Sequence, residues 1–213
     1  MRELILKMSM SLDGFVGSGD GGIKWVFHND PEAINWTLET VWNASVHIMG
    51  SRTFHDMAAY WPTSTGVFAP PMNQIPKAVF SKQGAAILEP AKTAGTTTAL
   101  KDARANSGDG ASATRQAGSE SWAKATVASG DLTAEIARLK AQDGKPIIAH
   151  GGASFARSLI AADLVDQYVL LVHPIALGKG LPIFSDVAMP RRLKLMSSKT
   201  FPAGAVAQIY RPA

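Results

Sequence analysis

Small, hydroxyl-bearing and charged residues follow several short apolar runs of this sequence, at the point where each run ends. Such runs are typical of buried strands, and the carboxyl ends of parallel strands meet at one edge of a sheet, where α/β proteins bind ligands. We therefore expect these residues to lie close together. They are Asp13 after the run 4–8; Gly50, Ser51, Arg52 and Thr53 after the run 46–49; Ser81 and Lys82 after the run 77–80; and Gly151, Gly152 and Ser154 after the run 147–149.

The glycine pair at 151 and 152 is the first candidate for an anion site. Two adjacent glycines let the backbone approach a ligand with no Cβ in the way, and the free N–H groups of a helix beginning at Ser154 can face an anion. This pattern predicts a phosphate-binding turn. A tight turn without a ligand is the alternative, because the pair lacks the full dinucleotide fingerprint.

A second helix start follows Gly50, with small hydroxyl side chains and Arg52 in its first turn. The helix dipole and the free N–H groups attract an anion, and an arginine can pair with it through two parallel hydrogen bonds. Ser81 and Lys82 add a hydroxyl and a cation at the next strand end. The three strand ends together predict one site for a phosphorylated small molecule.

Asp13 stands before Gly14, just past the first buried run. A carboxylate at this edge of the sheet could serve acid–base chemistry. The alternative is an Asp-Gly turn in which the side chain caps its own backbone. The glycines at 17, 19, 21 and 22 then predict a lid that ends at Trp25, and a plain surface loop is the alternative to the lid.

Strands and helices alternate along the chain, which predicts an α/β fold with a mostly parallel sheet. A helix at 154–162 joins the run 147–149 to the run 168–172. This crossover is so short that the two strands should be parallel neighbours. Asp30 and Pro31 mark the start of a helix, and the apolar residues at 34, 38, 41 and 42 should face the core. The segments 193–201 and 206–210 predict an antiparallel hairpin at the end of the sheet.

Residues 84–121 change in composition to Ala, Gly, Thr and Ser, with few large apolar residues. Such a segment cannot bury enough surface to order itself, so we interpret it as a low-complexity insertion, helical at most around 99–105. A passive excursion is the favoured interpretation, and a lid accessory is the alternative.

The composition indicates one domain over residues 1–213, with 46% hydrophobic residues to form its core. The chain has no cysteine, which excludes disulfides, thiolate catalysis and cysteine-based zinc sites, and no other metal site is predicted. The net charge is +4, but the cations are scattered, so we expect no nucleic-acid partner. The N-terminus is too polar for a signal peptide or a membrane span, so a cytoplasmic protein is expected.

These motifs together resemble the dihydrofolate reductase superfamily, and most closely its riboflavin-biosynthesis branch, the RibD C-terminal domain. The resemblance spans the chain except residues 84–121. It rests on SMSLDG (9–14), MGSRTF (49–54), FSK (80–82), HGG (150–152), LVD (164–166) and HPIALGKG (173–180).

The resemblance implies a three-layer α/β/α domain with an eight-stranded, mostly parallel sheet, and an NADPH site. The turns from Gly50 to Thr53 and from Gly151 through Ala153 to Phe155 would hold the pyrophosphate, and Arg52, Ser81 and Lys82 would receive the 2′-phosphate. Ser9 and Val16 would lie beside the nicotinamide, under a mobile loop that begins at Gly17 and ends at Trp25. Asp13 and Trp25 would face the substrate. The resemblance also suggests a cis peptide at Gly151-Gly152.

The resemblance implies an NADPH-dependent reductase of a small heterocycle, with Asp13 or an ordered water as the proton source, and a homodimer. Folate reductases carry an acid on the first helix, where this chain has Ile34 and Asn35, so dihydrofolate is not the expected substrate. The alternative is a non-catalytic NADPH-binding or dimeric interaction protein that retains the fold.

Overall fold

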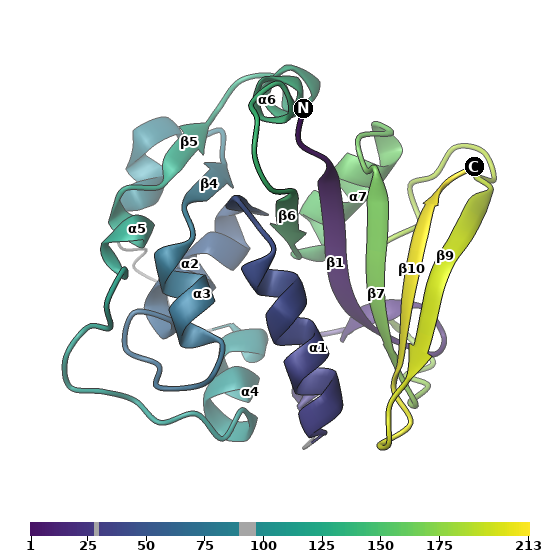
Figure 1. Ribbon diagram of the computed structural model, residues 1–213, viewed down its shortest axis with the longest axis horizontal. Coiled ribbons are helices and arrows are strands. Elements are labelled where there is room, and N and C mark those ends of the chain that lie inside the picture. Colours follow the sequence, from purple (N-terminus) through teal and green to yellow (C-terminus); the bar gives the residue numbers. More distant parts are fainter. Residues whose placement is uncertain (28–29, 90–96) are drawn as a thin grey trace.

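The computed structural model describes residues 1–27, 30–89 and 97–213 (Figure 1). Its centre is an eight-stranded sheet, parallel from β5 to β7 and antiparallel at β10 and β9. The strands run in the order β5 (Thr126–Ala128), β4 (Lys77–Phe80), β3 (Val46–Gly50), β6 (Ile147–His150), β1 (Leu4–Ser11), β7 (Gln167–His173), β10 (Val206–Pro212) and β9 (Leu193–Thr200). A small second sheet pairs β2 (Phe15–Ser18) with β8 (Gly180–Pro182).

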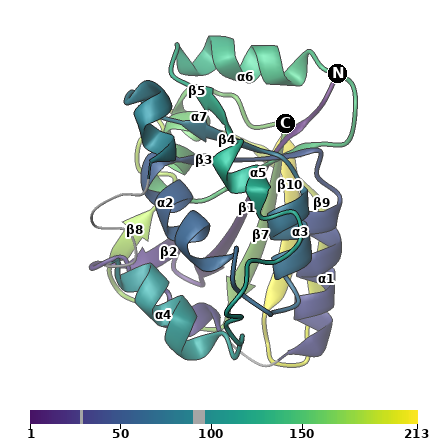
Figure 2. The same ribbon diagram turned by 90° about the vertical axis from the view of Figure 1, so that its left-hand side faces the viewer.

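Helices cover both faces of the sheet and give a three-layer fold (Figures 1 and 2). One face carries α1 (Pro31–Trp42), α2 (Ser51–Tyr60), α3 (Ala69–Gln74) and α5 (Glu120–Ala123), and the other carries α6 (Leu132–Lys140) and α7 (Ala153–Ala161). The remaining helical segments are η1 (Lys24–Val26), η2 (Gly84–Leu88) and α4 (Thr98–Asn106). No helix in the described ranges is both long and apolar enough to cross a membrane.

The predicted fold class is confirmed, including the antiparallel strand pair at the C-terminus and the helix that begins after Asp30. Two details of the prediction are wrong. The strands β6 and β7 are parallel but not neighbours, because β1 lies between them and pairs with both. Trp42 is 39% exposed, whereas Val41 is buried as predicted, and α1 also buries Ala33 and packs Trp36 on the core.

The segment predicted to lack order has packed parts as well as exposed ones among its described residues. Its helix α4 agrees with the expected helix around 99–105, and its large apolar side chains Ile87 and Leu100 are buried. Backbone hydrogen bonds tie it to the loop after α2, from Ser112 N to Thr63 O (2.7 Å) and from Gln116 N to Pro62 O (2.7 Å). The composition did not predict this packing, because a few buried side chains and several hydrogen bonds are enough to hold such a segment against the rest of the protein. Residues 90–96 lie outside the described part of the chain.

A buried lysine joins the end of this segment to the sheet. Lys77 Nζ donates to Asn73 O (3.0 Å) and to Ser121 Oγ (2.6 Å), and it lies 4.7 Å from the centre of the Trp122 ring. Trp122 Nε1 in turn donates to Asn73 Oδ1 (2.9 Å). The contacts link β4, α3 and α5, so residues 119–123 are part of the core rather than an appendage.

Replacing Leu100 by alanine should lower the free energy of unfolding by about 2–4 kcal/mol, because a buried leucine leaves a cavity. Leu100 is 3% exposed, whereas Leu12, the matched control, is 73% exposed. Leu12→Ala should change stability by less than about 0.5 kcal/mol. Urea unfolding measures both variants, and equal small losses would show that α4 does not belong to the core.

The stability of the protein should depend on pH through Lys77. Burial lowers the pKa of Lys77 to about 7, whereas an unfolded lysine titrates near about 10.4. Between these values the unfolded chain binds the extra proton, so this group raises the unfolding free energy with pH, by at most about 1.4 kcal/mol per pH unit. Below pH 7 the lysine is charged in both states, and its contribution to the slope vanishes.

Urea unfolding at pH 7.5 and pH 9.5 tests this linkage. Lys77→Met should flatten the rise in stability between the two pH values, and the exposed Lys101→Met should leave it as in the wild type. Burial also lowers the pKa of Lys7, to about 8, so a smaller rise in stability should remain in Lys77→Met. A rise as steep as that of the wild type in Lys77→Met would assign the effect to another group.

Candidate functional site

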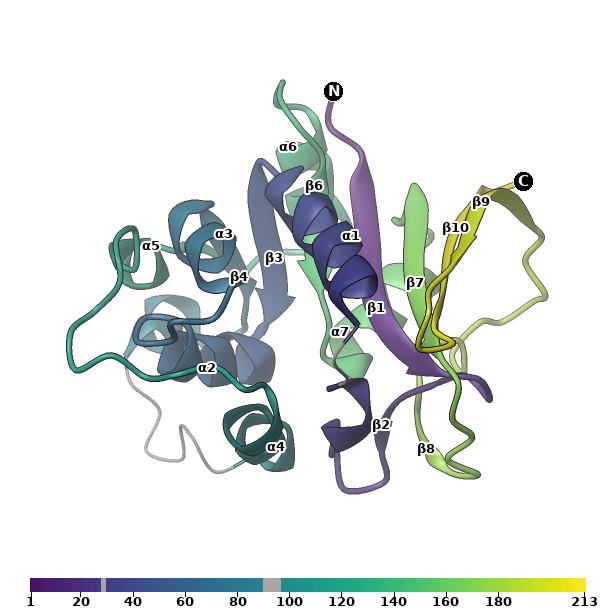
Figure 3. The same ribbon diagram turned by 60° about the horizontal axis from the view of Figure 1, so that its bottom comes forward.

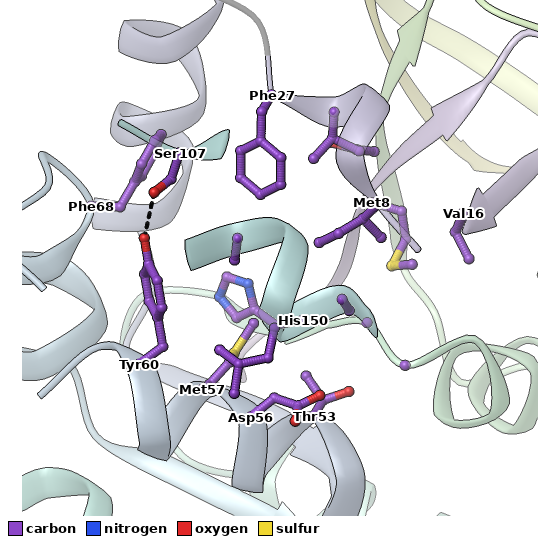
Figure 4. Close-up of a pocket in the computed structure, with 18 of the residues that line it drawn as sticks. Met8, Val16, Phe27, Thr53, Asp56, Met57, Tyr60, Phe68, Ser107 and His150 are labelled. Atoms are coloured by element: carbon purple, nitrogen blue, oxygen red, sulfur yellow. Dashed lines mark hydrogen bonds between the residues drawn. The ribbon is translucent and has the colours of Figure 1, made fainter. Parts of the chain in front are cut away.

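In Figure 3 the helices α2, α3 and α4 lie to the left of α1. Residues of these four helices and of β1 and β6 line a cavity of about 1020 Å³ (Figure 4). Its floor is formed by sheet residues, among them Lys7, Ser9 and His150. The helix α2 runs along it, so that Thr53 near the start of α2 and Tyr60 at its end both line it. Such a cavity is large enough for a small molecule beside part of a cofactor.

The helices α2 and α7 start side by side at one end of this cavity. A Cβ on Gly152 would lie 2.8 Å from Thr53 Oγ1, and a Cβ on Gly50 would lie 3.2 Å from Phe155 Cβ. Gly151 and Gly152 have φ angles of 38° and 67°, a region that favours glycine. The starts of α2 and α7 thus lie against each other, and Thr53 of one and Ala153 of the other line the same cavity.

The suggested cis peptide at Gly151-Gly152 is wrong. No peptide bond in the described ranges is cis, and the chain reverses through the positive φ angles of both glycines instead.

Both predicted cations, Arg52 and Lys82, lie at this end of the cavity, but they differ in whether the protein already engages their charged groups. The pairing of Gly50 with Phe80 sets Ser51 and Arg52 beside Ser81 and Lys82. The Arg52 guanidinium lines the cavity and makes no hydrogen bond or ion pair with the described residues. Lys82 Nζ donates to Gly130 O (3.0 Å), and Ser81 Oγ accepts from Gln83 N (3.1 Å). Arg52 is therefore the cation best placed to take an anion.

The predicted site residues divide into two groups. Those that line the cavity are Ser9, Val16, Arg52, Thr53, Gly151, Gly152 and Ala153. Those that flank it or lie apart from it are Asp13, Gly17, Trp25, Gly50, Ser51, Ser81, Lys82, Ser154 and Phe155.

Asp13 lies outside the cavity and is engaged elsewhere. Its carboxylate accepts from Leu177 N (3.1 Å), Gly178 N (2.7 Å) and Ser11 Oγ (2.6 Å). The hydrogen bond from Ser11 and those from the two backbone N–H groups hold the pKa of Asp13 below its usual value. The residue therefore joins two loops as a carboxylate, and this geometry does not support the predicted role of Asp13 as proton source or substrate ligand.

Trp25 also points elsewhere, with its ring 5.4 Å from the ring of His173. Its neighbour Phe27 enters the cavity instead (Figure 4). The glycine-rich loop before Trp25 is anchored at its end, because Asp102 Oδ2 on α4 accepts from Ile23 N (2.7 Å) and Lys24 N (3.0 Å). The segment predicted to be passive thus holds the loop predicted to be a lid.

Two basic residues on the floor were missing from the predicted site. Lys7 and His150 are register partners on β1 and β6, so their side chains share one face of the sheet. His150 is 8% exposed, its ring lies 4.5 Å from that of His47, and its Nε2 has no hydrogen-bond partner among the described residues. The Lys7 ammonium group makes no hydrogen bond or ion pair in the same ranges.

Burial controls the charge of this pair. It lowers the pKa of Lys7 to about 8. It also holds the pKa of His150 well below its usual value, with further lowering by His47, Lys7 and Lys77. At neutral pH the floor therefore carries a mostly charged lysine beside a neutral imidazole. The sequence did contain a signal for Lys7, because a lysine within an apolar run is unusual in a buried central strand and points to a functional role.

Asp56 is a third residue that the sequence did not single out. Its carboxylate lines the cavity and accepts from Thr97 Oγ1 at 2.8 Å, which fastens the start of α4 to α2. Burial raises the pKa of this carboxyl, although the hydrogen bond from Thr97 opposes the shift.

Comparison with solved structures supports the fold. A putative riboflavin biosynthesis protein from Shewanella sp. PV-4 superposes with a TM-score of 0.67 at 18% identity, over 100% of this chain and 99% of that one. A pyrimidine reductase-like protein from Corynebacterium diphtheriae gives 0.64 at 17% identity, over 100% and 92% of the two chains.

A deaminase/5-amino-6-(5-phosphoribosylamino)uracil reductase from Thermotoga maritima gives a TM-score of 0.61 at 17% identity. The match covers 100% of this chain but 57% of that protein, so this chain corresponds to little more than half of it.

Two proteins of Bacillus subtilis strain 168, both described as uncharacterized, are similar in sequence. YwjB is 23% identical over 209 residues, which cover 98% of this chain and 97% of YwjB. YyaP is 39% identical over 80 residues, which cover 38% of this chain and 43% of YyaP. The sequence also matches the RibD C-terminal domain over residues 2–207, and the chain therefore belongs to the RibD C-terminal domain family.

Proposed function

We propose that this protein is an NADPH-dependent reductase that reduces a C=N or C=O bond of a small heterocycle. One observation carries the proposal: the two glycine-bearing helix starts and the Lys7–His150 floor open into the same cavity. A dinucleotide held at the helix starts would thus share one space with a substrate on the floor. The reductase name of the Thermotoga maritima relative agrees with this chemistry.

The chain's own residues fit an NADPH molecule. The N–H groups at the starts of α2 and α7 would bind its pyrophosphate. The close approach of Thr53 and a positive φ angle favour glycine at 152, and the approach of Phe155 leaves little room for a side chain at 50. Arg52, assisted by Ser81 and Lys82, would bind the 2′-phosphate, and Ser9 and Val16 would lie beside the nicotinamide. The bound cofactor supplies a hydride.

Lys7 is the proposed proton donor. When the substrate carbon gains a hydride, the adjacent nitrogen or oxygen needs a proton, and the best acid has a pKa near the working pH. Lys7 meets this condition with a pKa of about 8 on the cavity floor. His150, neutral and without a partner at Nε2, would orient the substrate through a hydrogen bond. A proton would pass from Lys7 Nζ to the heteroatom, and solvent would restore it.

Arg52 should determine the preference for NADPH over NADH. Arg52→Ala should weaken NADPH binding by about 1.5–3 kcal/mol, the scale of a charge-assisted hydrogen bond, and leave NADH nearly unchanged. Fluorescence titration measures the affinity for each cofactor, and Lys101→Ala, at an exposed position of α4, is the control. Equal losses for NADPH and NADH would remove Arg52 from the 2′-phosphate site.

Replacement of Lys7 tests its role in proton transfer. Lys7→Met should keep NADPH binding and lower kcat by about 10²–10⁴-fold. In the wild type, kcat should fall as the pH rises through about 8, because the donor loses its proton. That decline should disappear in Lys7→Met and in Lys7→Arg. A decline that persists in both variants would assign the proton to another group.

We also propose a homodimer that uses the exposed edge strand β9. Phe201 is buried and Ile209 packs on the core, so these two apolar residues of the C-terminal hairpin are not available to a partner. Leu195 and Met196, however, are 51% and 48% exposed on the outermost strand.

Light scattering at micromolar concentration should give the mass of two chains for the wild type and of one chain for Leu195→Glu. Lys194→Glu, which changes an exposed polar position of the same strand, is the control. A monomeric wild type would refute the dimer, and a Leu195→Glu dimer would refute this interface.

A further inference from the structure

The outer wall of the cavity is formed by the segment that follows residue 96. Thr97 is hydrogen-bonded to Asp56 on α2, and Tyr60 OH at the end of α2 is bonded to Ser107 Oγ (2.7 Å) and Asp109 Oδ2 (2.8 Å). The helix α4 is thus fastened to α2 at both of its ends. Leu100 and Ala103 on α4 line the cavity between these ties, so the wall is a fixed part of the site.

The part of the cavity next to this wall is apolar and aromatic. Phe27, Phe68, Met57 and Tyr60 surround it, with Leu100 from α4 (Figure 4). Flat aromatic side chains and a methionine favour a planar ring through stacking and sulfur–aromatic contacts. A planar substrate could therefore lie here with one edge on Lys7 and His150.

The charges at this end of the cavity disfavour an anionic substituent. Asp56 and Asp109 both line the cavity beside α4. Among the described lining residues, the lysines and arginines are Lys7 on the floor and Arg52 at the cofactor end. Arg104 of α4 does not line the cavity, because it turns to Ala59 O (3.4 Å). Asp56 lies one turn after Arg52 on α2, and the charge of Arg52 opposes the rise in its pKa, so Asp109 is the carboxylate of the wall that no cation balances. A phosphate beside Asp109 would meet that carboxylate and lose its water without gaining a cation.

We infer that the substrate is an uncharged planar heteroaromatic compound with a carbonyl or ring nitrogen at one edge and without a phosphate-bearing arm. This inference rests on the proposed reductase function for the same site. It separates the chain from the Thermotoga maritima relative, whose name includes a phosphoribosylamino substituent. The wall at 97–109 contributes to this specificity through Leu100, which adds to the apolar surface, and Asp109, which disfavours a phosphate.

Lumichrome, riboflavin and flavin mononucleotide test the inference, because they share one ring and carry no arm, a neutral arm and a phosphorylated arm. Fluorescence titration measures their binding with and without saturating NADP⁺. Lumichrome should bind at least tenfold more tightly than flavin mononucleotide. Equal or tighter binding of flavin mononucleotide, or no binding of lumichrome, would overturn the inference.

The variant Asp109→Asn keeps the shape of the wall and removes one negative charge. It should reduce the preference for lumichrome over flavin mononucleotide several-fold, whereas Asp143→Asn, at an exposed carboxylate near the N-terminus, should not. An unchanged preference in Asp109→Asn would contradict the electrostatic argument.

Separate titration of NADPH distinguishes the two proposals. If NADPH fails to bind while lumichrome remains preferred, the reductase proposal fails and the account of the cavity stands. If NADPH binds and the preference is absent, the substrate inference fails alone.

Discussion

The close approach of the starts of α2 and α7 is the constraint on which the rest of the site depends. Gly50 lies against Phe155 and Gly152 against Thr53 at distances that leave no room for a Cβ on Gly152 and little on Gly50. This approach brings two sets of free N–H groups to the junction of β3 and β6. It also fixes the end of β6, and with it His150, beside Lys7 of β1. A residue larger than glycine at 152 would be strained by the φ angle of 67° and would have to displace the Thr53 hydroxyl.

Basic side chains on one face of the sheet are the second organising feature. Lys77 pairs in register with His47, and Lys7 pairs with His150, while the two imidazole rings lie 4.5 Å apart. Burial favours the neutral form of each group, and their mutual repulsion adds to the effect on His150. Lys77 is stabilised by hydrogen bonds to Asn73 and Ser121, whereas Lys7 has no such partners in the described ranges. Of the two lysines, Lys7 is the one that lines the cavity, and its ammonium group is therefore the one we propose as the proton donor.

Local patterns predicted the strands, the hairpin, the helix after Asp30 and the glycine turns, because each depends on residues close together in the sequence. They also predicted that the ends of β3, β4 and β6 would meet. The position of β1 between β6 and β7 depends on long-range pairing that no local pattern contains. The hydrogen bonds of Asp13 could not be predicted for the same reason, since its partners Leu177 and Gly178 lie far along the chain. The wall at 97–109 was missed because composition counts apolar residues and takes no account of hydrogen bonds such as Tyr60 to Asp109.

The central proposal is that a dinucleotide and a substrate share the cavity between the paired helix starts and the α4 wall. A crystal structure with NADP⁺ bound tests it most directly. We expect the pyrophosphate between the starts of α2 and α7, the 2′-phosphate on Arg52, and the nicotinamide beside Ser9 with its open face toward Lys7 and His150. A dinucleotide bound elsewhere, or a nicotinamide turned away from Lys7, would contradict it.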